Sequence, residues 1–155
     1  MIEKFSADAL SEHFDEDRLY EFTNGECLDF ASALSKAIGD EPHEFLALLY
    51  PQGRRTIIAH VAVCVGSHFY DADGVNDKTS LLVEWSYKSG IHHSKFSLEK
   101  VRSLSDVRLL AEKLNCEFFS DSEENSNAIL ETLQEMFEGV DESMPDVSIR
   151  ESVGI

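Results

Sequence analysis

The sequence predicts an α+β fold with an antiparallel sheet, and the order of its segments is the main support for this class. Helical periodicity fills residues 6–39, β-branched and apolar runs follow between residues 45 and 73, and helical periodicity returns after residue 105. Separate blocks of helices and strands are typical of α+β proteins. A length of 155 residues and a hydrophobic content of 43% indicate one domain with a sizeable core. We expect residues 1–139 to form this domain and residues 140–155 to form a flexible acidic tail.

The N-terminal block predicts two helices. Ser6 is placed to cap the first helix, which runs to about residue 22 and turns Leu10 and Phe14 inward. A break at residues 23–25 precedes the second helix, whose apolar residues recur at helical spacing until Gly39 provides a C-terminal cap. If Asn24 caps this second helix, Cys27 is its third residue.

The central block predicts strands. Residues 45–50 form a short apolar run, and residues 56–73 form a hairpin that turns at Gly66 and Ser67. Asp77 is placed to cap a helix that Gly90 ends, with Trp85 and Tyr87 packed over the sheet. Residues 91–98 are interpreted as an edge strand, and two further helices are expected to begin at Ser105 or Asp106 and at Asn125 or Ser126.

The formal net charge is −17, and it is unevenly distributed. Residues 1–50 carry a net charge of −9, residues 51–116 carry +2, and residues 117–155 carry −10. Such a field repels phosphate backbones and anionic lipids, so we expect neither nucleic-acid nor membrane binding. The same charge would attract a basic partner surface.

The cysteine content favours a reducing compartment. The three cysteines, Cys27, Cys64 and Cys116, are odd in number and include no CxxC motif, which argues against a disulfide framework and a structural zinc site. No basic segment followed by an apolar stretch begins the chain, and no apolar run is long enough to span a bilayer. These features predict a cytoplasmic protein.

Cys27 is the first candidate functional residue, because a cysteine near a helix N-terminus faces unpaired N–H groups and the positive end of the helix dipole. Both stabilise a thiolate, and the same amides can hold the oxyanion formed when a thiolate attacks an acyl group. Gly25 would let a substrate approach the backbone. Glu26 and Asp29 oppose this effect through their negative charge.

His60 and Asp71 are the second and third candidates. Strand alternation places His60 on the same face as Ile58, and an imidazole in so apolar a run needs a partner. After the hairpin turn, Asp71 is expected opposite residues 58–60, where its carboxylate would fix the imidazole tautomer. Asp73 could serve in its place. The three residues then form a nucleophile, a base and an orienting acid in the order Cys, His, Asp.

The stretches NGECLDFASAL, AHVAV and HFYDADG together resemble the papain-like cysteine hydrolase superfamily, in particular its compact bacterial and phage members and its transglutaminase-like and arylamine N-acetyltransferase branches. The resemblance covers roughly residues 20–77. It implies a nucleophile helix on a small antiparallel sheet, with Cys27 as nucleophile, His60 as general base and acid, and Asp71 as orienting residue. Peptidases of the superfamily usually carry a glutamine several residues before the cysteine. Position 21 is Glu in this chain, so Asn24 or backbone amides would hold the oxyanion.

The resemblance implies a thiol hydrolase or acyl transferase that acts on an amide or ester bond of a peptide, protein or small molecule and needs no cofactor. Other interpretations of the same residues stay open. Cys27 and His60 could be ordinary core residues, the DADG stretch could be only a turn, and the three side chains could bind Zn²⁺. The alternative function is a non-catalytic acidic protein that binds a basic partner surface, as a mimic of nucleic-acid charge.

Overall fold

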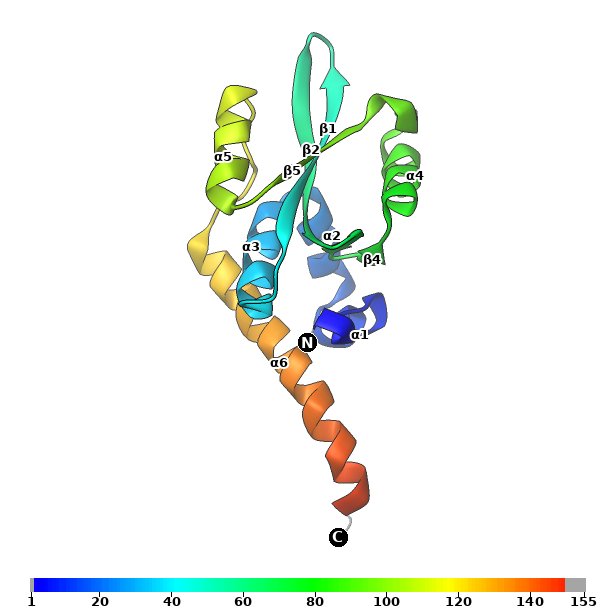
Figure 1. Ribbon diagram of the computed structural model, residues 1–155, viewed down its shortest axis with the longest axis vertical. Coiled ribbons are helices and arrows are strands. Elements are labelled where there is room, and N and C mark those ends of the chain that lie inside the picture. Colours follow the sequence, from blue (N-terminus) through cyan, green and yellow to red (C-terminus); the bar gives the residue numbers. More distant parts are fainter. Residues whose placement is uncertain (1, 150–155) are drawn as a thin grey trace.

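The computed structural model describes the backbone of residues 2–149 and the side chains of residues 2–138. Within this part of the chain, six α-helices and a five-stranded antiparallel sheet make an α+β fold (Figure 1), as the sequence predicts. Two short 3₁₀ helices, Ile2–Lys4 and His93–Lys95, accompany them. The helices are α1 (Ala7–His13), α2 (Glu16–Asn24), α3 (Cys27–Ile38), α4 (Lys78–Ser89), α5 (Leu104–Lys113) and α6 (Glu123–Ile149). The strands are β1 (Glu44–Gln52), β2 (Arg55–Val65), β3 (His68–Asp71), β4 (Gly74–Asn76) and β5 (Ser97–Val101).

The sheet has the strand order β4-β3-β2-β1-β5, and every neighbouring pair is antiparallel. Val65 pairs with His68, which confirms the predicted hairpin turn at Gly66 and Ser67; Gly66 has a φ of 62°, a conformation that favours glycine. The predicted edge strand is displaced. A 3₁₀ turn occupies residues 93–95, and the edge strand itself is β5, paired with β1.

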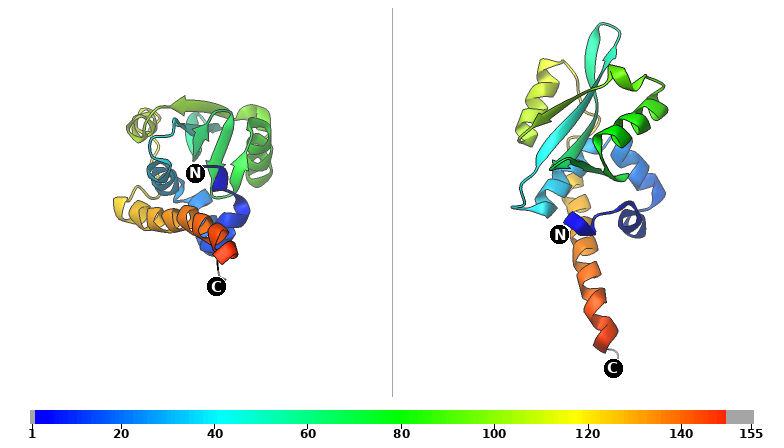
Figure 2. Two further views of the ribbon diagram at one scale, coloured as in Figure 1. Left: turned by 60° about the horizontal axis from the view of Figure 1, so that its bottom comes forward. Right: turned by 45° about the vertical axis from the view of Figure 1, so that its right-hand side comes forward.

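Helices cover both faces of the sheet (Figures 1 and 2). The main core lies between α3, α6 and one face of β2, where Val61 and Val63 point. A smaller cluster on the other face joins Leu81 of α4 to Ala62 and Cys64. Because consecutive strand residues point to opposite faces, one strand serves both clusters.

The predicted first helix is two helices. Ser6 caps α1 and accepts a hydrogen bond from the Ala9 N–H at 3.0 Å, as expected. The chain then leaves the helix at Phe14, and Asp15 caps α2 by accepting from the Arg18 N–H at 2.8 Å. Asp15 is a strong N-cap residue inside the stretch that we interpreted as continuous helix, so local capping outweighs the helical periodicity there.

A bulge in β2 corrects the predicted alternation. Leu48 pairs with His60 and Leu49 pairs with Ile58, so Ala59 is an extra residue in β2. Ile58 therefore packs with the main core instead of sharing the face of His60. An extra residue of this kind re-aims the side chains beside it.

The later helices differ from their predicted limits. Helix α5 begins at Leu104 after the cap Ser103, and α6 begins at Glu123. Helix α6 continues to Ile149, so residues 140–149 of the expected tail are helical, and residues 150–155 lie outside the described residues. Extending an existing helix by one residue is much easier than starting one, which favours this continuation. No helix in the described part of the chain is both long enough and apolar enough to cross a membrane.

Candidate active site

Cys27 is the first residue of α3, not the third as predicted. Helix α2 extends to Asn24 and ends on Gly25, which leaves Glu26 as the N-cap of α3. Glu26 makes no side-chain capping hydrogen bond. Since the first N–H groups of a helix have no acceptor within the helix, those that follow Glu26 stay available to a ligand at the α3 N-terminus.

Cys27 lies in the wall of a cavity of about 360 Å³, which we call the Cys27 cavity. The thiol is partly exposed. Asn24 and Gly25 line the same cavity, as do aromatic residues from three other segments: Tyr50, Trp85, Phe118 and Phe119. Phe119 is 93% exposed and lies over Gly25, where an added Cβ would meet the Phe119 Cβ at 3.6 Å. A small molecule or an extended chain in this cavity can therefore contact Cys27.

The side chain of Asn24 is occupied by its own helix. Its Nδ2 donates to the Tyr20 carbonyl at 2.8 Å and to Thr23 Oγ1 at 3.0 Å, which uses both amide hydrogens. The predicted role of Asn24 as a cap of α3 is wrong for this reason. In this conformation the backbone N–H groups of α3 are better placed than the Asn24 amide to receive an oxyanion.

His60 and Asp71 form a buried pair. His60 is 1% exposed, and its Nε2 lies 2.8 Å from Asp71 Oδ2. The second oxygen of Asp71 accepts a hydrogen bond from the Asp73 N–H at 2.9 Å, which fixes the plane of the carboxylate. Asp73 itself binds Lys88 at 2.8 Å, so the structure brings Asp71 and not Asp73 to the histidine.

The other ring nitrogen of His60, Nδ1, is buried, and no hydrogen-bond partner for it, nitrogen, oxygen or sulfur, is found among the described residues. Cys27 is its neighbour and acts on the charge of the ring. Burial disfavours the charged imidazole, but the hydrogen bond to Asp71 and the electrostatic attraction of Asp71 and Cys27 outweigh burial and raise the pKa of His60 to about 10. With Nε2–H donated to Asp71, Nδ1 is the ring nitrogen that is left to accept a proton.

The register of β2 and β3 places Asp71 relative to His60. The β2–β3 pairing runs from Val65 and His68 to Val63 and Tyr70, so Asp71 continues this register opposite Ala62 and not opposite residues 58–60 as expected. Asp71 reaches His60 diagonally along one face. The pairing of β3 with β2 ends at Tyr70.

Trp85 is a site residue whose role the sequence did not reveal. Its ring lies 4.9 Å from the His60 ring, centroid to centroid, at 33°. An indole face stabilises a nearby cation, so this contact favours the protonated imidazole as well as excluding water from it. Packing over the sheet was expected for Trp85 and is observed, whereas Tyr87 is 90% exposed and does not pack.

A second group that sequence reasoning missed is a polar network behind Cys27. Asp29 is 1% exposed and accepts hydrogen bonds from the Ser122 N–H and from Asn125 Nδ2, both at 2.8 Å, and from the Ser120 hydroxyl. Asn125 also donates to Glu26 at 2.7 Å, and Glu26 pairs with Arg18. The network therefore fixes the start of α3 against residues 118–122, which carry Phe118 and Phe119. Its members are up to 107 residues apart in the chain, and no local pattern connects them.

The other two cysteines differ in their surroundings. Cys64 is buried, and burial raises the pKa of its thiol. Cys116 is partly exposed in the wall of the Cys27 cavity. The rings of His92 and His93 are 4.3 Å apart, and both residues are exposed at the start of the 3₁₀ helix. No group of three metal-ligand side chains occurs among the described residues.

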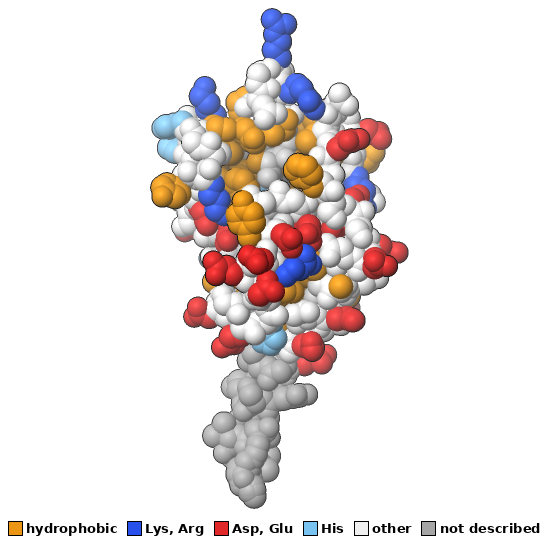
Figure 3. Space-filling model, turned by 180° about the vertical axis from the view of Figure 1, so that it is seen from behind, with side chains coloured by type: hydrophobic (Ala, Val, Ile, Leu, Met, Phe, Trp, Pro, Cys, Tyr) orange, Lys and Arg blue, Asp and Glu red, His pale blue; other side chains and the backbone are white. Residues whose placement is uncertain are grey.

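The face opposite to that of Figure 1 is divided by chemistry. Figure 3 shows hydrophobic side chains gathered in its upper half and acidic side chains below them. Comparison of the chain with protein-family models, with curated proteins and with solved structures gave no significant match. The chemistry of the site therefore rests on the arrangement of Cys27, His60 and Asp71.

Proposed function

We propose that this protein is a papain-like thiol hydrolase or acyl transferase that acts on an amide or ester bond of a peptide, protein or small molecule. One observation carries the proposal. His60 gives one ring nitrogen to Asp71 and holds the other, buried and without a partner, beside a solvent-reachable cysteine at a helix N-terminus. A histidine that only stabilised the core would have both nitrogens satisfied.

The reaction begins when Nδ1 of His60 takes the proton of the Cys27 thiol. The raised pKa of His60 supports this role as a base. The thiolate attacks the carbonyl carbon, a C–S bond forms, and the carbonyl π electrons move to the oxygen. The N–H groups at the start of α3 stabilise this oxyanion.

His60 then acts as an acid and as a base. It gives its proton to the leaving nitrogen or oxygen as the C–N or C–O bond breaks, which leaves an acyl-cysteine thioester. Water, or an amine in a transfer reaction, attacks the thioester while Nδ1 takes its proton. Cleavage of the C–S bond returns the thiolate. Asp71 keeps the ring oriented throughout, and no cofactor enters the scheme.

Alkylation of individual cysteines tests the nucleophile. We expect iodoacetamide to label Cys27 faster than Cys64 or Cys116 near neutral pH, because thiolate is the reactive form. His60→Ala should lower the Cys27 rate by about tenfold or more, in the range of general-base effects. His43→Ala, at a histidine outside the site, is the matched control. Equal, slow labelling of all three thiols would contradict the proposal.

The alternative, an acidic protein that binds a basic partner, is favoured by the charge of −9 over residues 1–50 and −10 over residues 117–155. Such binding should weaken steeply as salt is raised, whereas alkylation of Cys27 should change little. A basic protein that is retained at low salt by both the native chain and Cys27→Ser, together with an unreactive Cys27, would select the alternative.

A further inference from the structure

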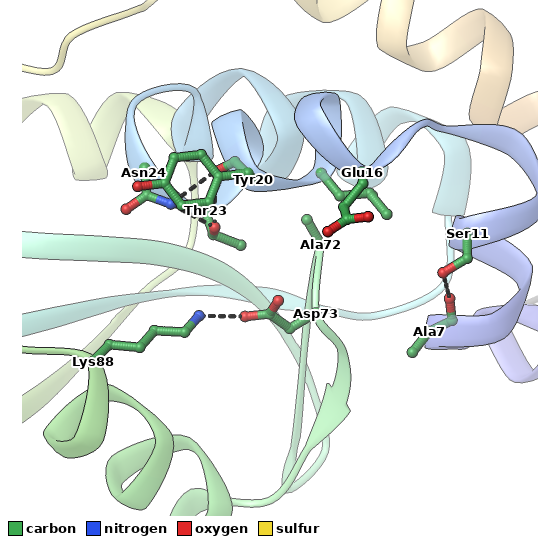
Figure 4. Close-up of a pocket in the computed structure, with 10 residues that line it drawn as sticks. Ala7, Ser11, Glu16, Tyr20, Thr23, Asn24, Ala72, Asp73 and Lys88 are labelled. Carbon is green, nitrogen blue, oxygen red and sulfur yellow. Dashed lines mark hydrogen bonds and ion pairs between the residues drawn. The ribbon is translucent and has the colours of Figure 1, made fainter.

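A second cavity adjoins the Cys27 cavity and extends the site. Its volume is about 570 Å³, and it lies between α1 and α2 on one side and the turn after Asp71 and α4 on the other (Figure 4). We call it the α2–α4 cavity. Asn24 lines both cavities, and Ala72 and Asp73 of the α2–α4 cavity directly follow the Asp71 that holds His60. A substrate longer than one residue that reacts at Cys27 therefore has two adjacent cavities to occupy.

The charge of the α2–α4 cavity is negative. The Glu16 carboxylate is directed into it from α2 (Figure 4), and none of the ion pairs between described side chains includes Glu16. Lys88 also lines the cavity, but it is bound to Asp73 at 2.8 Å and lies 3.6 Å from Glu84. The positive charge of Lys88 is therefore offset within the protein, and the charge of Glu16 is not.

The shape of the α2–α4 cavity suits a long cationic side chain. Tyr20, which is 69% exposed, and Leu19 line it beside Thr23, and an aromatic ring with aliphatic neighbours can cover the stem of a lysine or arginine. Asp17 and Glu21 add negative charge to α2. The only base of this helix, Arg18, is already paired with Glu21 and Glu26.

The Cys27 cavity has the opposite character. Its lining includes the aromatic residues Tyr50, Trp85, Phe118 and Phe119, and such surfaces bind apolar groups. Its two charged lining residues, Arg55 and Glu117, are of opposite sign. The two cavities therefore differ in the side chains that they favour, one cationic and one apolar.

We infer that the substrate of this protein is an extended polypeptide with a lysine or arginine side chain in the α2–α4 cavity and an apolar side chain in the Cys27 cavity. The inference rests on the proposed function, because it takes Cys27 as the point of reaction. A polypeptide with an acidic side chain in the α2–α4 cavity would place that side chain against Glu16 and would bind poorly.

Protection of Cys27 from alkylation measures this preference without knowledge of the scissile bond or its direction. The competitors are three pools of acetylated hexapeptide amides. Each peptide has one phenylalanine, one variable residue and otherwise glycine and alanine, in all positional arrangements. The variable residue is lysine, norleucine or glutamate. The pool concentration that halves the iodoacetamide rate at Cys27 is the measured quantity.

We expect the lysine pool to protect at about a tenfold lower concentration than the glutamate pool in about 20 mM salt, and the difference to shrink in about 500 mM salt. Glu16→Gln should reduce the preference for lysine about threefold, as the loss of one surface charge contact would. Asp17→Asn is the matched control, because it removes a charge from the same helix end at a residue that does not line the cavity. It should leave most of the preference intact.

Equal protection by the three pools would overturn the inference, as would equal effects of Glu16→Gln and Asp17→Asn, which would mean an unspecific acidic field. These failures are distinct from failure of the proposed function. If Cys27 is alkylated rapidly and in a His60-dependent way but shows no lysine preference, only the inference falls. If unprotected Cys27 is unreactive, the proposed function and the inference fall together.

Discussion

The two ring nitrogens of His60 meet different surroundings, and this difference is the chemical basis of the site at the level of single residues. Nε2 binds a carboxylate that is itself held by a backbone N–H, while Nδ1 is left for the sulfur. Trp85 covers the ring and keeps the pair away from water. A low local dielectric strengthens each of these interactions, so small changes here should have large effects.

The charge of His60 predicts a pH dependence of stability. Because Asp71 and Cys27 raise the pKa of His60 from 6.5 to about 10, the folded protein binds this proton more tightly than the unfolded chain does. The stabilisation should be complete below pH 6.5 and should decline as pH rises toward 10, with a slope of at most about 1.4 kcal/mol per pH unit. Urea unfolding of the native chain and of His60→Gln across this pH range measures the free energy of unfolding of each. The difference between the two, plotted against pH, gives the slope that is due to His60. Parallel curves would contradict the prediction.

The role of Asp71 as acceptor of two hydrogen bonds can be tested by substitutions that remove one or both of its oxygens. Its two oxygens serve His60 and the Asp73 N–H separately. Asp71→Asn keeps one oxygen and should lose one bond, whereas Asp71→Ala should lose both, at about 1–3 kcal/mol for each buried group left unpaired. Asp73→Asn should change the free energy of unfolding by less than about 0.5 kcal/mol, because its pair with Lys88 is exposed. A larger loss in Asp73→Asn than in Asp71→Ala would contradict this assignment.

At the level of elements, the junction of α2 and α3 decides how the sulfur is presented. Helix α2 uses Asn24 and Gly25 for its own end, and α3 therefore begins on the cysteine itself. The bulge at Ala59 lies immediately before His60 and sets the face on which the imidazole lies. The end of α2 and the bulge at Ala59 therefore set the positions of the Cys27 and His60 side chains.

The hydrogen-bond network around Asp29 should stabilise the fold and hold residues 118–122 against the start of α3. Asp29→Ala removes the acceptor for Ser120, Ser122 and Asn125, so we expect a loss of stability of about 2–4 kcal/mol and slower alkylation of Cys27 as residues 118–122 lose their anchor. Asp106→Ala, at a half-buried acid in the first turn of α5, is the control for the loss of a helix-end carboxylate. Urea midpoints and labelling rates measure both effects. An unchanged midpoint in Asp29→Ala would show that the network does not hold α3.

At the level of the whole molecule, two strongly negative segments enclose a nearly neutral centre. The segment 51–116 carries four of the five strands and a net charge of +2, while residues on either side of it carry −9 and −10. The main core joins elements from all three segments, because α3 and α6 pack together over β2. Folding therefore brings like charges together.

This distribution predicts that added salt stabilises the fold. Self-repulsion of a chain with net charge −17 opposes the compact state, and ions screen this repulsion more than they weaken the few surface ion pairs. The urea midpoint should therefore rise between about 20 mM and 300 mM sodium chloride, within which the Debye length falls to less than half. Potassium chloride should have the same effect if screening is the cause. A lower midpoint would mean that ion pairs dominate.

Much of the fold follows from local patterns, and these patterns are physical signals within a few residues. The apolar periodicity of α3, the β-branched run of β2, the Gly66 turn and the Asp77 cap all lie where the sequence places them. Each depends on side chains and backbone groups that are neighbours in the chain, so the chain itself reports them. Local signals also mark Cys27, His60 and Asp71, because these residue types are unusual for their surroundings in the sequence.

The tertiary structure decided what depends on packing between distant segments. The division of α1 from α2, the bulge at Ala59 and the continuation of α6 reflect competition between local preferences, which periodicity alone does not resolve. The choice of Asp71 over Asp73, the cover by Trp85 and the Asp29 network require contacts between residues that are 11 to 107 apart in the chain. The sequence by itself determined the elements and the candidate residues; only the fold determined which side chains meet, because burial and distance are properties of the assembled core.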